Sequence, residues 1–365
     1  MKLNRPSGRW SLPLVQRRIQ LSDLMNALLL LAVIALVLEL FPSNYYMLLP
    51  GDARSVDPML SIKGYPPVHG HGGLYMTDVT VYKVDHKLEE LYGRLNPQAD
   101  LEPTQAVSGG LSQRQYLHLN AQLMTNSIQE AEVAALTALG RYKITCAASK
   151  PQIQGVLPHT PAARVLRPGD VIAAVDGQAV CSTTQTFPLV RRFRPGRVLH
   201  LTILRGNKPV SVAVRTVAAR RTRTGLQPDP HGATPIIGVS LQDVLLPGSI
   251  HLPVKIHINP GNTVGPSAGL MFTLAIIERL ERRDIARGCK VAGTGTVDYN
   301  GVVGPIGGAK QKIIAARGAG AQYFLVPTEP DNLGPARANR GSIRVIPVRS
   351  VRAALQALSR IGPCT

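Results

Sequence analysis

Residues 261–272 read GNTVGPSAGLMF and place one serine between a glycine-proline turn and an apolar run. Pro266 suits the first turn of a helix, and the residues after it are apolar on nearly every face, so the pattern predicts a buried helix. Ser267 then has two interpretations. It is a helix cap, the commoner role for such a serine, or a nucleophile beside Gly265 and helix-start amides suited to an oxyanion.

A second segment supplies the base that a serine nucleophile needs. Residues 293–327 read GTGTVDYNGVVGPIGGAKQKIIAARGAGAQYFLVP. Lys310 and Lys312 point to nearly opposite sides of the helix predicted over 309–317, so only one of them can face the serine. Periodicity leaves that choice open. Burial would have to lower the lysine pKa by about 2 to 3 units before the amine could act as a base at neutral pH.

Together the two segments resemble the proteolytic domain of Lon serine peptidases. The shared words are GPSAG, Thr-Gly-x-Val and V-x-P-I-G-G-x-K-x-K-x-x-A-A. The resemblance implies that Ser267 is the nucleophile and Lys312 the base, that Thr294 holds the amine, and that Gly265 and Pro266 shape the serine turn. Lon enzymes often carry an aspartate three residues before the serine, where this chain has Val264.

His257 offers a different base. It precedes Ser267 on the strand predicted over 254–258 and shares one face with Lys255 and Asn259, so a Ser-His-Asp arrangement is conceivable. The Lon resemblance implies instead that His257 supports the active-site strand, because histidine is not the base of that family.

The remaining pattern from residue 234 onward alternates strands and helices. Upstream, residues 74–84 read as a strand, and two helices are predicted after it, each opening with a capping box, at Ser112 and at Ser127. These upstream elements faintly resemble the opening strand and helix of the Lon proteolytic domain. The Lon-type domain would then consist of two chain segments, separated by the residues between the predicted upstream helices and residue 234.

The intervening residues form a small β-rich domain. Residues 155–180 read GVLPHTPAARVLRPGDVIAAVDGQAV and resemble the PDZ domains of HtrA-type proteases. PDZ domains bind an extended peptide at a sheet edge. We expect that groove at Ile153, Gly155, Val156 and Leu157; a β-rich spacer without a ligand is the alternative.

The N-terminus is membrane-directing. Basic residues precede an apolar run over 24–41, which predicts an uncleaved single-pass anchor with a cytoplasmic N-terminus and an extracytoplasmic remainder. A cleaved signal peptide is the alternative, although no small-x-small site follows the run closely.

The charge of +19, from 41 Lys and Arg against 22 Asp and Glu, suits an anionic partner. The arginines between residues 191 and 223 leave a polyanion-binding surface open. We expect no nucleic acid partner, because no basic motif is interleaved with aromatic residues. Four dispersed cysteines without a C-x-x-C pair predict no metal site and leave their disulfide state open. No G-x-x-x-x-G-K-[ST] motif occurs, so we expect no ATP and no other cofactor.

The predicted fold class is α+β: a transmembrane helix, a β-rich PDZ domain, and a mixed α/β Lon-type domain into which the PDZ domain is possibly inserted. The predicted segments are residues 1–20 (cytoplasmic basic N-terminus), 21–48 (anchor), 62–140 (N-terminal part of the Lon-like domain), 145–218 (PDZ domain), 219–232 (basic linker) and 233–365 (proteolytic domain).

This order resembles the membrane-anchored Lon-like serine proteases with a PDZ domain, the YlbL-type family. The resemblance implies an ATP-independent serine endopeptidase of the cell membrane that cleaves exported or membrane-associated proteins, with unfolded chains or exposed C-termini as partners. A homo-oligomer stays open. A catalytically inactive, membrane-tethered PDZ scaffold is the alternative function.

Overall fold

The computed structural model describes residues 21–68, 72–109, 111–145, 148–206, 208–222, 225–246 and 248–364. The chain forms two compact units, which are described separately. The first combines the residues up to Leu49 with Thr80–Leu111, and the second combines Pro50–Val79 with Ser112–Thr365. The basic N-terminus predicted over 1–20 lies outside the described residues.

The first unit holds helix α1 (Leu21–Glu39), the first part of strand β1 (Pro42–Ser55) and the last part of strand β3 (Gly73–His86). It also contains α2 (Lys87–Leu95), β4 (Asp100–Pro103) and α3 (Thr104–Ser108). β1 pairs antiparallel with β4. A small core of Met47, Val84 and Ala99 holds the unit together.

Helix α1 bears on the predicted anchor. Within the described residues, no helix combines the length and apolar character that crossing a membrane requires. The helix ends at Glu39, and β1 begins at Pro42. The anchor boundary predicted at residue 48 is therefore wrong, because residues 42–48 belong to a strand that pairs within a sheet.

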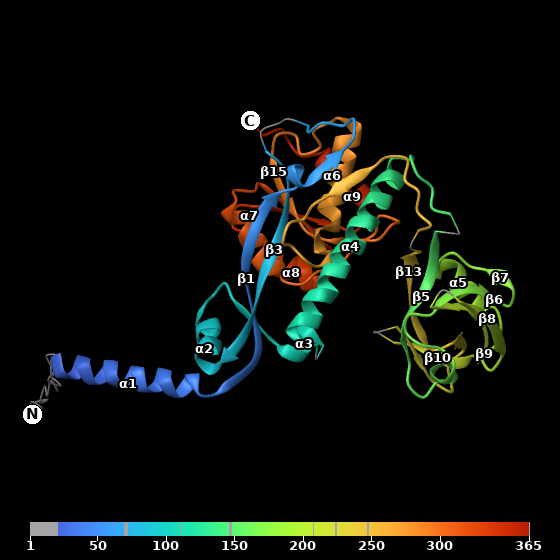
Figure 1. Ribbon diagram of the computed structural model, residues 1–365, viewed down its shortest axis with the longest axis horizontal. Coiled ribbons are helices and arrows are strands. Elements are labelled where there is room, and N and C mark those ends of the chain that lie inside the picture. Colours follow the sequence, from blue (N-terminus) through green and yellow to red (C-terminus); the bar gives the residue numbers. More distant parts are fainter. Residues whose placement is uncertain are drawn as a thin grey trace, which may run out of the picture. The chain divides into compact units, whose positions relative to one another are not determined.

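The larger domain of the second unit is built on strands in the order β19-β18-β15-β3-β1. Figure 1 labels β15, β3 and β1 of this sheet. β15 pairs in parallel with both β18 and β3, and β18 pairs in parallel with β19. The elements of this domain beyond β1 and β3 are η1 (Asp57–Met59), β2 (Leu60–Ile62), α4 (Gln113–Ala138), β14 (Ile256–Ile258), η3 (Pro266–Ala268), α6 (Gly269–Glu281), β15 (Lys290–Gly293), β16 (Thr296–Val297), β17 (Val303–Gly304), α7 (Ala309–Gly318), β18 (Tyr323–Pro327), α8 (Pro330–Ala338), β19 (Arg344–Val348) and α9 (Val351–Leu358).

Helix α4 is continuous where the sequence predicted two helices. The capping box at Ser112 with Gln115 is confirmed. Ser127, the second predicted cap, lies inside the helix and is buried. Ser127 and Glu130 have the spacing of a capping box, but the Ser127 hydroxyl bonds the Pro266 carbonyl instead of a helix amide. Figure 1 shows α4 running beside α6.

One hydrophobic core unites segments from both sides of the small β-rich domain. Met76 and Ala134 lie upstream of that domain in the sequence, and Phe272 and Leu325 lie downstream, yet all four belong to one buried cluster. The larger domain is therefore assembled from two chain segments, and the β-rich domain is inserted between them. The upstream segment also starts earlier than the predicted residue 62, because Val56 and Leu60 are in the same cluster.

The inserted domain has its own sheet, in the order β13-β5-β6-β8-β9, and its own core around Ile153, Ile172 and Leu201. Its elements are β5 (Ser149–Val156), η2 (Pro161–Arg164), β6 (Val171–Val175), β7 (Gln178–Ala179), α5 (Thr183–Arg191), β8 (Val198–Arg205), β9 (Lys208–Arg215) and β13 (Val239–Leu245). The domain predicted over 145–218 thus continues to Leu245.

The basic stretch over 219–232 is not an unstructured linker. β10 (Val217–Thr222) pairs with β11 (Gly225–Pro228) and with β12 (Thr234–Ile236). Arg220 forms an ion pair with Asp229 across this small sheet. The linker prediction took basic residues and prolines as signs of an unpaired segment, whereas exposed arginines are compatible with a strand whose backbone is paired on both sides.

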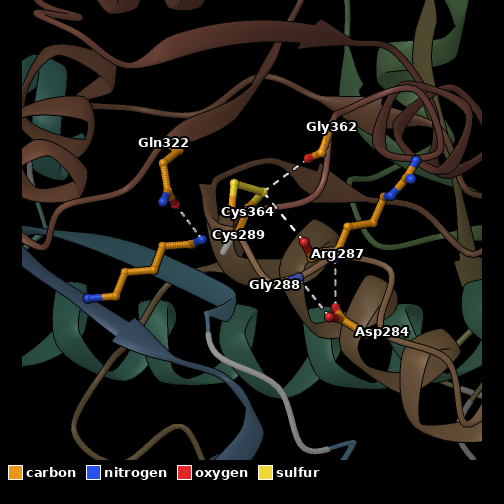
Figure 2. The surroundings of a disulfide bond; sticks show 8 residues. Asp284, Arg287, Gly288, Cys289, Gln322, Gly362 and Cys364 are labelled. Carbon is orange, nitrogen blue, oxygen red and sulfur yellow. Dashed lines mark hydrogen bonds between the residues drawn. A yellow bond between two sulfur atoms is a disulfide. The ribbon is translucent and has the colours of Figure 1, made fainter.

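A disulfide between Cys289 and Cys364 closes the larger domain, with an S–S distance of 2.05 Å (Figure 2). Cys289 directly precedes β15, so the bond ties the end of the chain to the central strand. The turn before Cys289 is fixed by Asp284, whose carboxylate accepts the amides of Arg287 and Gly288. The disulfide therefore fastens an already rigid turn.

The split core makes a prediction about truncation. A fragment of residues 225–365 lacks β3 and α4, so we expect it to show no cooperative thermal unfolding by circular dichroism. The matched control removes residues 149–245 and joins Ala148 to Leu246, whose amide donates to the Ala148 carbonyl at 2.9 Å, through a short glycine-serine linker. We expect that shortened chain to unfold cooperatively. A well-folded 225–365 fragment would contradict the shared core.

Candidate active site

Ser267 lies in the short helix η3, immediately before α6. Gly265 precedes it with φ +93°, a backbone conformation that favours glycine. The Gly265 amide donates to the Asn120 carbonyl at 2.9 Å, and Ser127 Oγ donates to the Pro266 carbonyl at 2.9 Å. Two residues of α4 therefore hold the serine turn. Because the Gly265 amide is occupied by this bond, it is not one of the amides available to an oxyanion.

The Ser267 side chain does not cap a helix. The N-cap of α6 is Ala268, which makes no side-chain capping bond, and η3 also lacks one. The Ser267 hydroxyl instead accepts a hydrogen bond from Lys312 Nζ at 2.8 Å. Of the two interpretations of this serine, the structure supports the reactive pair.

Lys312 reaches the serine from the first turns of α7. Its side chain is 3% exposed, and Nζ also donates to Thr294 Oγ1 at 3.1 Å. Gly308 starts α7 with φ +67°, and a Cβ there would lie 2.6 Å from Val79. Glycine thus lets α7 begin directly against β3, which brings Lys312 to the carboxyl end of the central strands.

Burial lowers the pKa of Lys312 to about 7, and the charge of Asp78 opposes that shift. A charged amine loses its hydration inside the protein, so the neutral form is favoured. Near neutral pH a substantial fraction of this lysine has a free lone pair. It can then accept the proton of a hydroxyl group 2.8 Å away.

Thr294 links the base to the backbone of the serine. Its hydroxyl accepts from Lys312 and donates to the Ser267 carbonyl at 3.1 Å. The Gly295 amide donates to the same carbonyl at 2.8 Å. Thr294 is fully buried, so the hydroxyl, the amine and the serine backbone form one fixed cluster.

The structure brings together three of the residues proposed from the sequence and separates a fourth. Ser267, Lys312 and Thr294 share hydrogen bonds. His257 lies in β14, exposed, with its backbone paired to Ser61. Strand alternation does place Lys255, His257 and Asn259 on one exposed face. No described hydrogen bond joins His257 to the serine.

Sequence reasoning missed the residues that hold the serine turn. Asn120 acts through its backbone carbonyl, which any residue could provide, so its identity carries no signal. Ser127 was singled out, but as a cap. Its real contact joins residues 139 positions apart in the chain, and no local pattern reports such a distance.

A second candidate site lies in the inserted domain, between β13 and α5. A groove of about 300 Å³ opens there, beside the edge strand of the sheet. Its lining residues are Leu157, Phe187, Val190, Arg191, Pro235, Ile236, Ile237, Gly238, Val239 and Leu241. Apart from Arg191, the lining side chains are apolar.

This groove differs from the site predicted for the β-rich domain. Only Leu157 of the four predicted residues lines it. In strand β5, Gly155 and Val156 pair with Ser240 and Val239 of β13, and Ile153 is buried in the core. Strand β6 pairs with β5 at Gln152. The backbone groups that pair with β13 are not free to pair with a peptide on that side. The signal overlooked was the apolar run at 235–239, which was assigned to the other domain.

Comparison with known proteins identifies the two domains. Residues 236–358 match the Lon protease (S16) C-terminal proteolytic domain, and residues 130–216 match the PDZ domain. The Lon match starts at residue 236, within the last part of the β-rich domain, which ends at Leu245 in the structure.

Two curated relatives show how much is shared. Lon protease 3 of Sorangium cellulosum is 30% identical over 132 residues, which is 35% of this chain and 15% of that protein. The Lon protease of Chloroflexus aggregans is 39% identical over 113 residues, which is 30% of this chain and 14% of that protein. The chain thus spans no more than 15% of the length of these relatives.

Among solved structures, the PDZ domain of an SdrC-like protein from Listeria monocytogenes is 25% identical. The match covers 27% of this chain and 93% of the Listeria chain, with a TM-score of 0.22. From the two domain matches and the Lon relatives, we conclude that this chain carries a serine peptidase domain of the Lon type together with a PDZ domain.

Proposed function

We propose that this protein is a serine endopeptidase in which Ser267 is the nucleophile and Lys312 the general base. The observation that carries the proposal is the 2.8 Å hydrogen bond between Lys312 Nζ and Ser267 Oγ inside a buried site. A hydroxyl within hydrogen-bonding reach of a neutral amine is the arrangement that nucleophilic catalysis needs. Thr294 keeps the amine in place through its 3.1 Å contact.

The reaction follows from this geometry. Neutral Lys312 takes the proton of Ser267, and the serine oxygen attacks the peptide carbonyl, whose oxygen becomes an oxyanion near the amides at the start of η3. The protonated lysine then delivers the proton to the leaving amine, and an ester remains on Ser267. Water, deprotonated by Lys312, cleaves the ester and returns both side chains to their starting state.

We also propose that the PDZ groove binds substrate peptides. An extended peptide can add to β13, because this strand forms one edge of its sheet. The apolar groove beside it, with Phe187, Val190 and Ile237, suits an apolar side chain of that peptide. Exposed C-termini and unfolded segments are the substrates that such a groove would select.

The proposed location is the cell membrane, with the N-terminus in the cytoplasm and the peptidase domain outside. Helix α1 exposes most of its large apolar side chains, among them Leu28, Leu29 and Leu31, and lipid would cover them. The Cys289–Cys364 disulfide suits an oxidising compartment. Exported and membrane-associated proteins would then be the substrates. Proteolysis would need no ATP, since residues 1–365 contain no G-x-x-x-x-G-K-[ST] phosphate-binding motif.

Labelling with a fluorophosphonate probe tests the catalytic pair. We expect the wild-type chain to label, and we expect Ser267→Ala and Lys312→Met to lose at least about 100-fold in labelling rate. Lys310→Met is the matched control, because it removes a lysine from the same helix, and it should label normally. If the wild-type chain neither labels nor cleaves an unfolded protein, the inactive PDZ scaffold becomes the better description.

The same labelling should depend on pH. Only the neutral amine accepts a proton, and the pKa of Lys312 is about 7. The rate should therefore rise with pH and level off above about pH 8. A rate that stays flat between pH 5.5 and 9 would contradict lysine as the base.

The buried amine also has a measurable effect on stability. The folded pKa of Lys312 lies below its ordinary value of 10.5, so the unfolded chain binds more protons between about pH 7 and 10.5. Burial of Lys312 thus costs stability below pH 7, and that cost disappears as pH rises toward 10.5. We expect Lys312→Met to raise the free energy of unfolding in urea by a few kcal/mol at pH 6.5, on the order of 1.4 per pKa unit, and by little at pH 10.

Peptide affinity tests the groove. Phe187 is 37% exposed, so Phe187→Ala should leave the fold intact. We expect it to weaken, at least about 10-fold, the binding of the tightest peptide from a C-terminal peptide library, measured by fluorescence anisotropy. Gln154→Ala, on the exposed face of β5, is the control and should bind normally. The opposite pattern would place the peptide on β5.

A further inference from the structure

A charged pair outside the Ser-Lys cluster joins the central strands to the serine loop. Asp78 on β3 accepts a hydrogen bond from Arg54 Nη2 on β1 at 2.8 Å, and its other oxygen accepts the Asp52 amide at 2.6 Å. A Cβ on Gly51 would lie 2.1 Å from that oxygen. Glycine therefore lets β1 approach closely enough to fix both oxygens of Asp78.

Arg54 also reaches the loop that carries the nucleophile. Its Nη2 donates to the hydroxyl of Thr263, four residues before Ser267. The loop backbone is close as well, since a Cβ on Gly261 would lie 3.9 Å from Arg54 Nη1. Among the described residues, Arg54 Nε is buried without a hydrogen-bond partner. The Arg54 guanidinium thus bonds both Asp78 of β3 and Thr263 of the serine loop.

Asp78 acts on the catalytic base as well. Its charge raises the pKa of Lys312 and so opposes the effect of burial. Burial and the charge of Asp78 are the two causes of the Lys312 shift, and no other titratable group on α7, β18 or α8 is among them. The other titratable groups on these elements are Lys310, Arg317, Tyr323, Asp331 and Arg337. An unpaired carboxylate here would favour the charged amine, which cannot act as a base.

We propose that Arg54 and Asp78 are positioning residues for the peptidase reaction: Arg54 holds the serine loop through Thr263 and neutralises the Asp78 carboxylate, whose charge acts on Lys312. The pair has two separable effects. The Thr263 contact keeps the Ser267 hydroxyl beside the amine, and the ion pair keeps the amine neutral near pH 7. The inference rests on the proposed roles of Ser267 and Lys312.

The experiment uses the full chain and measures two quantities. The first is the rate of fluorophosphonate labelling at Ser267 between pH 5.5 and 9.5. The second is the titration of the Lys312 side chain, followed by NMR on lysine labelled with ¹³C and ¹⁵N, with Lys312→Met assigning the signal. The second measurement needs no activity, so failure of this inference is distinguishable from failure of the proposed reaction.

The variants separate charge from loop contact. Arg54→Met leaves Asp78 unpaired, and we expect the Lys312 midpoint to rise by about one pH unit and labelling at pH 7 to fall about 10-fold or more. Asp78→Asn should lower the midpoint. Arg54→Lys keeps the charge and should restore the midpoint but only part of the rate. Thr263→Val removes only the loop contact, so its rate should fall several-fold at an unchanged midpoint.

Thermal unfolding shows which variants fold. If Arg54→Met does not fold, Thr263→Val and Arg54→Lys still test the proposal. A wild-type midpoint in Arg54→Met and Asp78→Asn would overturn the electrostatic role. A wild-type rate in Thr263→Val would overturn the loop role. A fall in rate that tracks a lower melting temperature in every variant, with no shift of the midpoint, would reduce the pair to a structural ion pair.

Discussion

The hydrogen bond from Lys312 Nζ to Ser267 Oγ joins the starts of two helices that are 45 residues apart in the chain. It requires an amine held out of water, because only a desolvated lysine is neutral near pH 7. The neighbouring residues enclose the amine and hold it beside the serine. Gly308 brings α7 against β3, α4 holds the serine turn through Asn120 and Ser127, and Thr294 accepts a second hydrogen bond from the amine.

The same condition explains why the larger domain is assembled from two chain segments. The downstream segment carries the serine, the threonine and the lysine, but the surfaces that bury them belong to β3 and α4, which lie upstream. The inserted PDZ domain folds on its own core, and Ala148 and Leu246 meet at its ends. An insertion whose ends meet leaves the surrounding core undisturbed.

The candidate site was largely predictable from the sequence, whereas the supporting contacts were not. Residue chemistry alone pointed to Ser267 and to two lysines, and the resemblance of GPSAG, Thr-Gly-x-Val and PIGGAKQK to Lon peptidases implied the roles of Lys312 and Thr294. The peptide groove was predicted along β5, whereas the structure has an apolar groove beside β13. Strand pairing is non-local, so the pattern of β5 alone does not show that it pairs with β13. The basic strand β10 was missed because its partners lie beyond a turn.

The sequence by itself determined the buried helix after Ser267, one candidate nucleophile and two candidate lysine bases, since these follow from residue chemistry and short-range periodicity. The roles of Lys312 and Thr294 and the two domain types were implied by the resemblance to Lon peptidases and PDZ domains. Only the tertiary structure showed that Lys312 is buried, that Ser127 bonds the Pro266 carbonyl from inside α4 instead of capping a helix, and that Arg54 and Asp78 lie at the site. The physical reason is that burial and charge pairing depend on which segments meet in space. Residues such as Asp78 and Thr263 meet through Arg54 only after the sheet and the serine loop have formed.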